Sequence, residues 1–128
     1  MNPTDEHLRT FFGRYAEALT AGDLKATSGC YAVPSLVLSD TGSVPITARE
    51  EIEATFDGAA ERYRGQGLVA LRPTLVASEA LSEGLVSVDV CWDYLDEQGR
   101  SVQQNGYRYV LRLEDEASPK IQVVIGTR

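Results

Sequence analysis

The first part of the chain repeats its apolar residues at helical spacing. From Thr4 to about Ala21 they recur every three or four positions, which predicts an amphipathic helix. Thr4 suits its N-cap, and Asp5 and Glu6 would lie near the positive end of the helix dipole. The apolar stripe consists of Leu8, Phe11, Phe12, Tyr15, Ala18 and Leu19.

Two further helices follow. Gly22 suits the end of the first helix and Asp23 the N-cap of a short second one, which Pro34 stops. That second helix would turn Leu24, Thr27 and Tyr31 toward the core.

A third helix begins after a short strand at Ser35–Ser39 and a turn at Asp40–Ser43. Thr47-Ala48-Arg49-Glu50 has the pattern of a capping box, in which the Thr47 and Glu50 side chains each satisfy a backbone amide. The buried stripe would be Ile52, Phe56, Ala59, Ala60 and Tyr63, and Gly65 and Gly67 end the helix.

Beyond Leu68 the apolar period changes from helical to alternating, which indicates strands. We predict them at Leu68–Ala80, Leu85–Leu95, Ser101–Leu113 and Lys120–Gly126. Helices followed by strands with short connections indicate a segregated α+β fold. We therefore expect residues 1–128 to form one domain, with three N-terminal helices packed on a curved antiparallel sheet around one apolar pocket.

The two central strands allow a register to be predicted. If Gln98-Gly99 is a two-residue loop, Val90 lies opposite Tyr107, Val88 opposite Tyr109, and Trp92 opposite Asn105. These residues then share the face under the helices. Asp89, Cys91 and Asp93 share the other face with Arg108, so we expect that face to be solvated or packed on another subunit. A slip of one residue would exchange the two faces.

Charge and composition exclude several classes of partner. A formal net charge of -7 disfavours nucleic acid and anionic membrane surfaces, which are normally bound by clustered basic residues. Cys30 and Cys91 lie far apart in apolar segments and are expected to be buried free thiols. With one histidine, His7, and two separated cysteines, we expect no metal site and no cofactor. The polar N-terminus and the lack of long apolar runs favour a cytoplasmic protein.

The string Tyr15-Ala16-Glu17-Ala18-Leu19-Thr20-Ala21-Gly22-Asp23-Leu24, with the order of elements after it, resembles the superfamily named for nuclear transport factor 2. This superfamily includes ketosteroid isomerases, SnoaL-like polyketide cyclases and scytalone dehydratase. The resemblance implies a cystatin-like cone with a mixed, mainly antiparallel sheet and an internal cavity. It also implies a homodimer formed through the sheet.

The resemblance carries over to single residues only in part. Tyr15 occupies the place of the isomerase tyrosine that donates a hydrogen bond to the dienolate oxygen. Ser39 stands at the place of the catalytic aspartate, with Asp40 one position away, and the second oxyanion donor falls near Arg108 or Tyr109. The resemblance therefore does not imply ketosteroid isomerase activity.

Each candidate residue has a structural alternative. Tyr15 is an oxyanion donor or a core tyrosine, and Asp40 is a general base or a turn residue. The remaining candidates would line a ligand pocket or form an aromatic core: Phe12, Phe56, Trp92, Asn105, Tyr107 and Tyr109. We expect a protein that binds a small apolar or polycyclic molecule. The alternatives are a cofactor-free isomerase, cyclase or dehydratase, and a structural module that dimerises through its sheet.

Overall fold

A computed structural model describes residues 4–114 and 118–127. The helices are α1 (Asp5–Ala21), α2 (Leu24–Gly29), α3 (Arg49–Phe56) and α4 (Ala59–Gly65). The strands are β1 (Tyr31–Ser39), β2 (Gly42–Ile46), β3 (Ala70–Ser82), β4 (Leu85–Leu95), β5 (Ser101–Arg112) and β6 (Lys120–Gly126).

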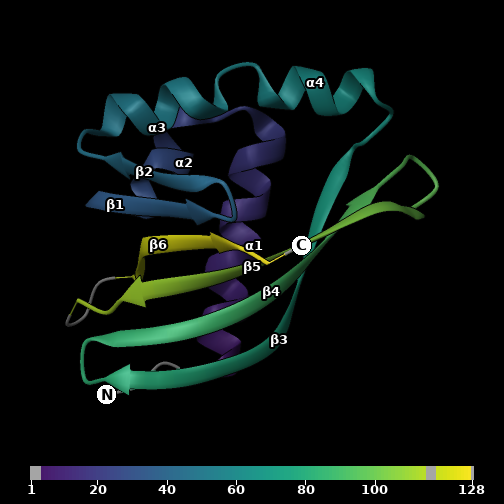
Figure 1. Ribbon diagram of the computed structural model, residues 1–128. Helices are drawn as coiled ribbons and strands as arrows, with labels where there is room; N and C mark the ends of the chain where they lie inside the picture. The colour runs from purple at the N-terminus through teal and green to yellow at the C-terminus, as the bar shows by residue number, and fades with distance from the viewer. Residues whose placement is uncertain (1–3, 115–117, 128) are drawn as a thin grey trace.

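One six-stranded sheet in the order β2-β1-β6-β5-β4-β3 forms the scaffold. Neighbouring strands are antiparallel except β1 and β6, which run parallel. Helix α1 lies across one face of the curved sheet, and α3 and α4 follow one another along one end (Figure 1). The predicted α+β fold with a mixed sheet is confirmed.

Helix α1 has the two ends that its sequence predicts. The Thr4 side chain accepts a hydrogen bond from the His7 amide at 3.1 Å, and Gly22 ends the helix in the left-handed conformation, with φ 71°. Its apolar stripe is buried, and Phe12 is 0% exposed. The helix therefore supplies one wall of the core.

The predicted third helix is divided. Asp57 and Gly58 interrupt it, and Gly58 adopts a left-handed φ of 79° that favours glycine. The apolar stripe continues through the break, so periodicity alone could not reveal it.

The predicted cap of this helix is shifted by one residue. Because Ala48 is the N-cap, the third helical residue is Glu51 and not Glu50. The Glu51 carboxylate accepts hydrogen bonds from the amides of Thr47 and Ala48 at 2.7 and 3.0 Å, and from the Thr47 hydroxyl at 2.9 Å. Only half of the capping box is formed.

The first hairpin differs from its prediction. Strand β1 begins at Tyr31, before Pro34, and β2 was not predicted as a strand. Tyr31 pairs with Ile121 of β6, and the ladder is irregular up to Leu36 because proline has no amide to donate. Strand β2 is a short edge strand that contains Pro45, a residue that argues against a strand in sequence. The turn at Asp40 is confirmed.

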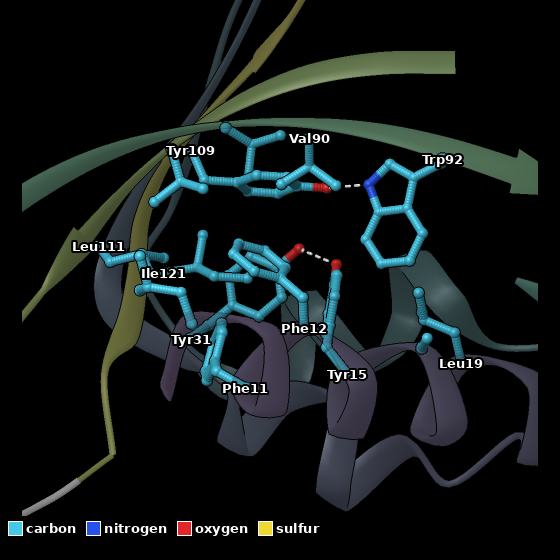
Figure 2. Close-up of a cluster of buried hydrophobic side chains, with 14 of the residues drawn as sticks. Phe11, Phe12, Tyr15, Leu19, Tyr31, Val90, Trp92, Tyr109, Leu111 and Ile121 are labelled. Atoms are coloured by element: carbon cyan, nitrogen blue, oxygen red, sulfur yellow. Dashed lines mark hydrogen bonds between the residues drawn. The ribbon is translucent and has the colours of Figure 1, made fainter. Parts of the chain in front are cut away.

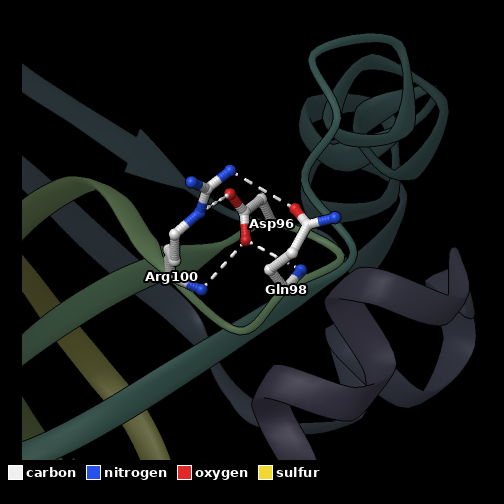
Figure 3. A network of polar contacts seen from close by, with 3 residues as sticks. All are labelled: Asp96, Gln98 and Arg100. Atoms are coloured by element: carbon white, nitrogen blue, oxygen red, sulfur yellow. Dashed lines mark hydrogen bonds and ion pairs between the residues drawn. The ribbon is translucent and has the colours of Figure 1, made fainter.

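The predicted register of β4 and β5 is confirmed: Val90 pairs with Tyr107 and Trp92 with Asn105. The two-residue loop is wrong, because Leu95 pairs with Ser101 and the strands shift register at that point. The Asp96 carboxylate holds the longer loop by accepting from the amides of Gln98 and Arg100 and from Arg100 Nε, each at 2.9 Å (Figure 3).

The outer face of the sheet carries two separate carboxylates. Arg108 Nε donates to Asp89 at 2.6 Å, which confirms the predicted charge pair. Asp93 was expected on a face that is solvated or packed on another subunit, and within the single chain it is only 6% exposed. Its carboxylate accepts from Ser101 Oγ at 2.6 Å and from Gln104 Nε2 at 2.7 Å, and Arg72 lies 3.5 Å away. The Ser101 and Gln104 hydrogen bonds lower the pKa of Asp93.

Cys30 and Cys91 are free thiols, as predicted, and both are half-buried. In the described ranges, no helix has the length and apolar character required to cross a membrane.

Replacement of Asp93 by asparagine should change how stability depends on pH. Because the folded-state pKa is lowered, the carboxylate stabilises the fold above its unfolded pKa of about 3.9, and this is lost as pH falls through the lower folded-state pKa. Urea unfolding should show a large difference between wild type and Asp93→Asn at pH 7 that shrinks toward pH 2.5. Asp89→Asn, at a more exposed pair, is the control. An equal Asp93→Asn difference at both pH values would contradict this role.

Candidate functional site

A cavity of about 270 Å³ lies between the inner face of the sheet and α1, α3 and α4. Fifteen of the described residues line it, among them all six tyrosines and the only tryptophan of the chain. The others are Phe56, Thr55 and six aliphatic residues: Leu19, Val37, Ile46, Ile52, Leu71 and Val124. The wall is therefore aromatic and aliphatic, with hydroxyl groups as its main polar atoms.

Two pairs of polar groups lie at the inner end of the cavity. The hydroxyls of Tyr15 on α1 and Tyr31 on β1 are 2.6 Å apart. Trp92 Nε1 on β4 donates to the hydroxyl of Tyr109 on β5 at 2.9 Å. Figure 2 shows both pairs between α1 and the sheet, with the hydroxyls of the two pairs on facing sides of the same interior.

Tyrosine hydroxyls are protonated at neutral pH, and burial raises the pKa values of these three further. Burial is the largest cause of the raised pKa values of Tyr15, Tyr31 and Tyr109. At neutral pH each hydroxyl therefore carries a proton that it can donate, and none offers a charged oxygen.

The hydroxyl protons outnumber their acceptors. The Tyr109 oxygen accepts from Trp92, but among the described residues its own proton has no acceptor. One hydroxyl of the Tyr15 and Tyr31 pair donates to the other, and the second proton likewise has no acceptor within the described ranges. Two O–H donors are thus available at the inner end of the cavity, where an unpaired polar group is costly.

None of the lining residues is Asp, Glu, His, Lys, Arg or Cys. No group of three or more His, Cys, Asp or Glu side chains that could hold a metal ion occurs in residues 4–114 and 118–127. The described part of the lining can therefore surround a largely apolar molecule and donate hydrogen bonds to an acceptor atom on it. This part of the lining has no carboxylate or imidazole that could take a proton from the molecule.

Five of the eight predicted site residues line the cavity: Tyr15, Phe56, Trp92, Tyr107 and Tyr109. Three do not. Phe12 is 0% exposed and packs behind the wall, with its ring centroid 5.0 Å from that of Tyr109. Asn105 lies outside the lining and donates to the Tyr94 hydroxyl at 3.0 Å. Asp40 is exposed in the turn between β1 and β2, so the turn interpretation describes its position.

Sequence reasoning missed three lining tyrosines. Tyr94 could have been found from the register of β4, which places it on the same face as Trp92. Tyr63 belongs to the predicted helix stripe, but its place beside the cavity depends on the break at Gly58. Tyr31 was assigned to a helix and instead begins β1, which turns its hydroxyl toward Tyr15.

Removal of one hydroxyl from the Tyr15 and Tyr31 pair should destabilise the fold. Tyr15→Phe or Tyr31→Phe should each lower the free energy of unfolding by about 1 kcal/mol, because the partner hydroxyl stays buried without its hydrogen bond. The double variant should lose less than the sum, since no unpaired hydroxyl remains there. Urea unfolding of the four proteins measures this coupling, and strictly additive losses would show that the pair is not an interacting unit.

Comparison with known proteins identifies the family of this chain. Residues 5–127 match the family described as NTF2-like protein (DUF6841). A search of curated proteins found no match.

Several solved structures share the fold. An NTF2-like protein of unknown function from Shewanella oneidensis MR-1 has a TM-score of 0.70 and 16% identity, covering 95% of this chain and 97% of that chain. A cystatin-like domain of unknown function from Nostoc punctiforme has a TM-score of 0.73 and 16% identity, covering 97% and 76%. An NTF2-like protein from Novosphingobium aromaticivorans has a TM-score of 0.68 and 16% identity, covering 95% and 79%. These identities show a common fold alone, whereas the family match spans nearly the whole sequence, so this chain belongs to the NTF2-like protein family DUF6841.

Proposed function

We propose that the protein binds a small, uncharged, largely apolar molecule in the cavity without transforming it. The observation that carries this proposal is the combination of an open aromatic cavity with two hydroxyl donors that have no acceptor among the described residues. Apolar walls with a few placed polar groups are typical of small-molecule sites.

The size of the cavity limits the ligand. An apolar protein cavity of about 150 Å³ holds benzene. The present volume of about 270 Å³ therefore suits one or two fused rings better than a four-ring steroid skeleton. The open space also argues against a purely structural role, which would favour a core filled by the chain's own side chains.

The chemistry of the wall limits the ligand further. A carbonyl or ether oxygen at the inner end could accept from Tyr109 and from the Tyr15 and Tyr31 pair. A carboxylate would be buried without a cation, which costs far more than the hydrogen bonds return. We therefore propose a neutral ligand with a hydrogen-bond acceptor, such as an aromatic ketone.

Catalysis is the weaker alternative. A cofactor-free isomerase, cyclase or dehydratase needs a group that accepts a proton from its substrate. Tyr15 could stabilise a developing oxyanion, but the lining has no carboxylate or imidazole to act with it, and Asp40 lies in an exposed turn. Passive binding needs neither group.

Three naphthalenes of similar shape test this proposal. 2-Acetylnaphthalene should bind about five- to tenfold more tightly than 2-ethylnaphthalene, because it accepts a hydrogen bond worth about 1 kcal/mol. 2-Naphthoate should bind most weakly because its charge is buried without a partner. Titration of Trp92 fluorescence measures all three, since Trp92 is the only tryptophan and lines the cavity.

Tyr109→Phe provides the matched variant. It should lower the preference for the ketone over the hydrocarbon without abolishing it, because the ring stays and the Tyr109 O–H donor is lost, while the Tyr15 and Tyr31 pair still donates. The variant also leaves the Trp92 N–H without its acceptor. The affinities for the ketone and the hydrocarbon are compared within each protein, so a change in the fluorescence intensity of Trp92 itself does not alter their ratio. Failure of all three probes to bind, or a tighter carboxylate, would overturn the proposed function.

We further propose that two copies associate through the outer face of the sheet. Five half-buried aliphatic side chains form a continuous patch there: Leu36, Leu38, Val110, Val123 and Ile125. They alternate along the strands with inward residues such as Val124, and neighbouring members pair directly, as Leu36 does with Val123. A patch of this kind is a favourable surface for a homodimer.

Val123→Lys tests the homodimer. Light scattering after size exclusion should give twice the 14.0 kDa chain mass for the wild type and the single mass for the variant. A lysine introduced at this position would be buried in the interface near the same lysine of the second copy, and the two buried charges would oppose association. Val44→Lys, at an exposed edge-strand position outside the patch, should remain dimeric. A monomeric wild type would contradict the proposal.

A further inference from the structure

The mouth of the cavity lies between the helices α3 and α4 and one end of the sheet. The deepest lining residues, including Tyr15 and Trp92, are buried, whereas Thr55 is exposed and Tyr63, Tyr94 and Tyr107 are half-buried. The exposed and half-buried lining residues therefore mark where solvent meets the cavity. A ligand that reaches the inner hydroxyls has to pass this rim.

One aromatic contact bridges the rim. The rings of Tyr63 on α4 and Tyr94 on β4 meet edge to face, with their centroids 5.9 Å apart and an interplanar angle of 65°. Both residues line the cavity. Their contact joins the helical side of the mouth to the sheet side.

The two rings are held differently. Tyr94 lies on a strand paired on both sides, opposite Leu71 and Gln103, and its hydroxyl accepts from Asn105. The Tyr63 hydroxyl has no hydrogen-bond partner among the described residues. Tyr63 is therefore the ring that can move while Tyr94 stays in place.

The helix that carries Tyr63 is short and is bounded by two glycines. Helix α4 starts after Gly58, with φ 79°, and is followed by Gly67, with φ 77°. Ala59 and Ala60 are buried at the start of α4, and Tyr63 lies one turn farther along. The other end is held too, because Leu68 is buried and its amide donates to the Tyr63 carbonyl at 2.9 Å. The backbone of α4 is therefore anchored on both sides of Tyr63, and the movement we consider is that of the Tyr63 side chain.

We propose that Tyr63 and Tyr94 form an aromatic gate at the rim, in which Tyr63 moves away from Tyr94 to widen the mouth for molecules that enter the cavity. An edge-to-face pair of this kind raises the ratio of closed to open molecules by only about two- to tenfold, so thermal motion often separates the two rings. The gate rests on the proposed function for its biological use, because it controls entry to that binding site. Its existence can be tested without any ligand.

Acrylamide quenching of Trp92 fluorescence measures entry directly. Acrylamide is neutral and small, and Trp92 is 3% exposed and lines the cavity, so the quencher has to pass the mouth. Tyr63→Ala should raise the quenching rate constant about two- to tenfold, the factor by which the pair favours the closed state. Tyr63→Phe retains the ring and should behave as wild type.

Ile121→Val is the control for general loosening. Ile121 is 0% exposed in the core and does not line the cavity. Equal quenching of Tyr63→Ala and wild type, or an equal rise in Ile121→Val, would overturn the gate. If Tyr63→Ala does not melt cooperatively, Tyr63→Leu replaces it, because leucine fills part of the space without an aromatic contact.

Ligand kinetics then separate the gate from the binding site. Stopped-flow mixing with 2-acetylnaphthalene should show association about two- to tenfold faster in Tyr63→Ala, whereas Kd is not expected to stay constant, because Tyr63 also lines the cavity. A changed Kd with unchanged rates of entry would make Tyr63 a binding residue and overturn its role as a gate. If the wild type does not bind the ketone, the proposed function fails, while the acrylamide experiment still decides the gate.

Discussion

The pairing of β4 with β5 is the constraint on which the rest of the structure depends. Val90 opposite Tyr107 places Trp92 and Tyr109 on the inner face, toward α1 (Figure 2). Because side chains alternate along a strand, a shift of one residue would turn those rings to solvent and bring Asp89 and Asp93 inside. The hydrogen bond from Trp92 to Tyr109, the cavity wall and the outer charge pair all follow from this one register.

The inner polar groups show how a tyrosine-rich core remains compatible with burial. A phenol contributes a large apolar surface and one hydroxyl, which costs little when it is paired with another. Tyr15 with Tyr31 and Trp92 with Tyr109 use this solution. Each pair satisfies its oxygen and leaves one O–H proton without a protein acceptor among the described residues. The same arrangement that permits burial therefore leaves O–H donors at the inner end of the cavity, which is the basis of the ligand proposed above.

The sequence predicted the fold and five of the residues that line the cavity, but not the shape of the rim. Alternation and period identify α1, β4, β5 and β6 well, because each buries one regular face. The break at Gly58 lies inside a continuous apolar stripe, so pattern alone cannot show that Tyr63 is carried on a separate short helix. Tyr31 was predicted in a helix because a proline usually ends one, but Pro34 lies within β1. The predicted register already places Gln104 opposite Asp93, but the contact of Asp93 with Ser101 could not be predicted, because it depends on the longer loop between β4 and β5.

An open cavity in so small a chain has an energetic consequence. Vacant apolar volume weakens a fold by about 24 cal/mol per Å³, so a dry space of about 270 Å³ would cost several kcal/mol, comparable with the whole stability of a small domain. The rings around it cannot collapse inward, because Trp92 and Tyr109 are fixed by the sheet and Tyr15 by α1. A ligand that fills the space and accepts from the hydroxyls would recover part of that free energy on binding. The cavity therefore makes the stability of the chain and its proposed binding function one linked equilibrium, in which ligand affinity appears as added resistance to unfolding.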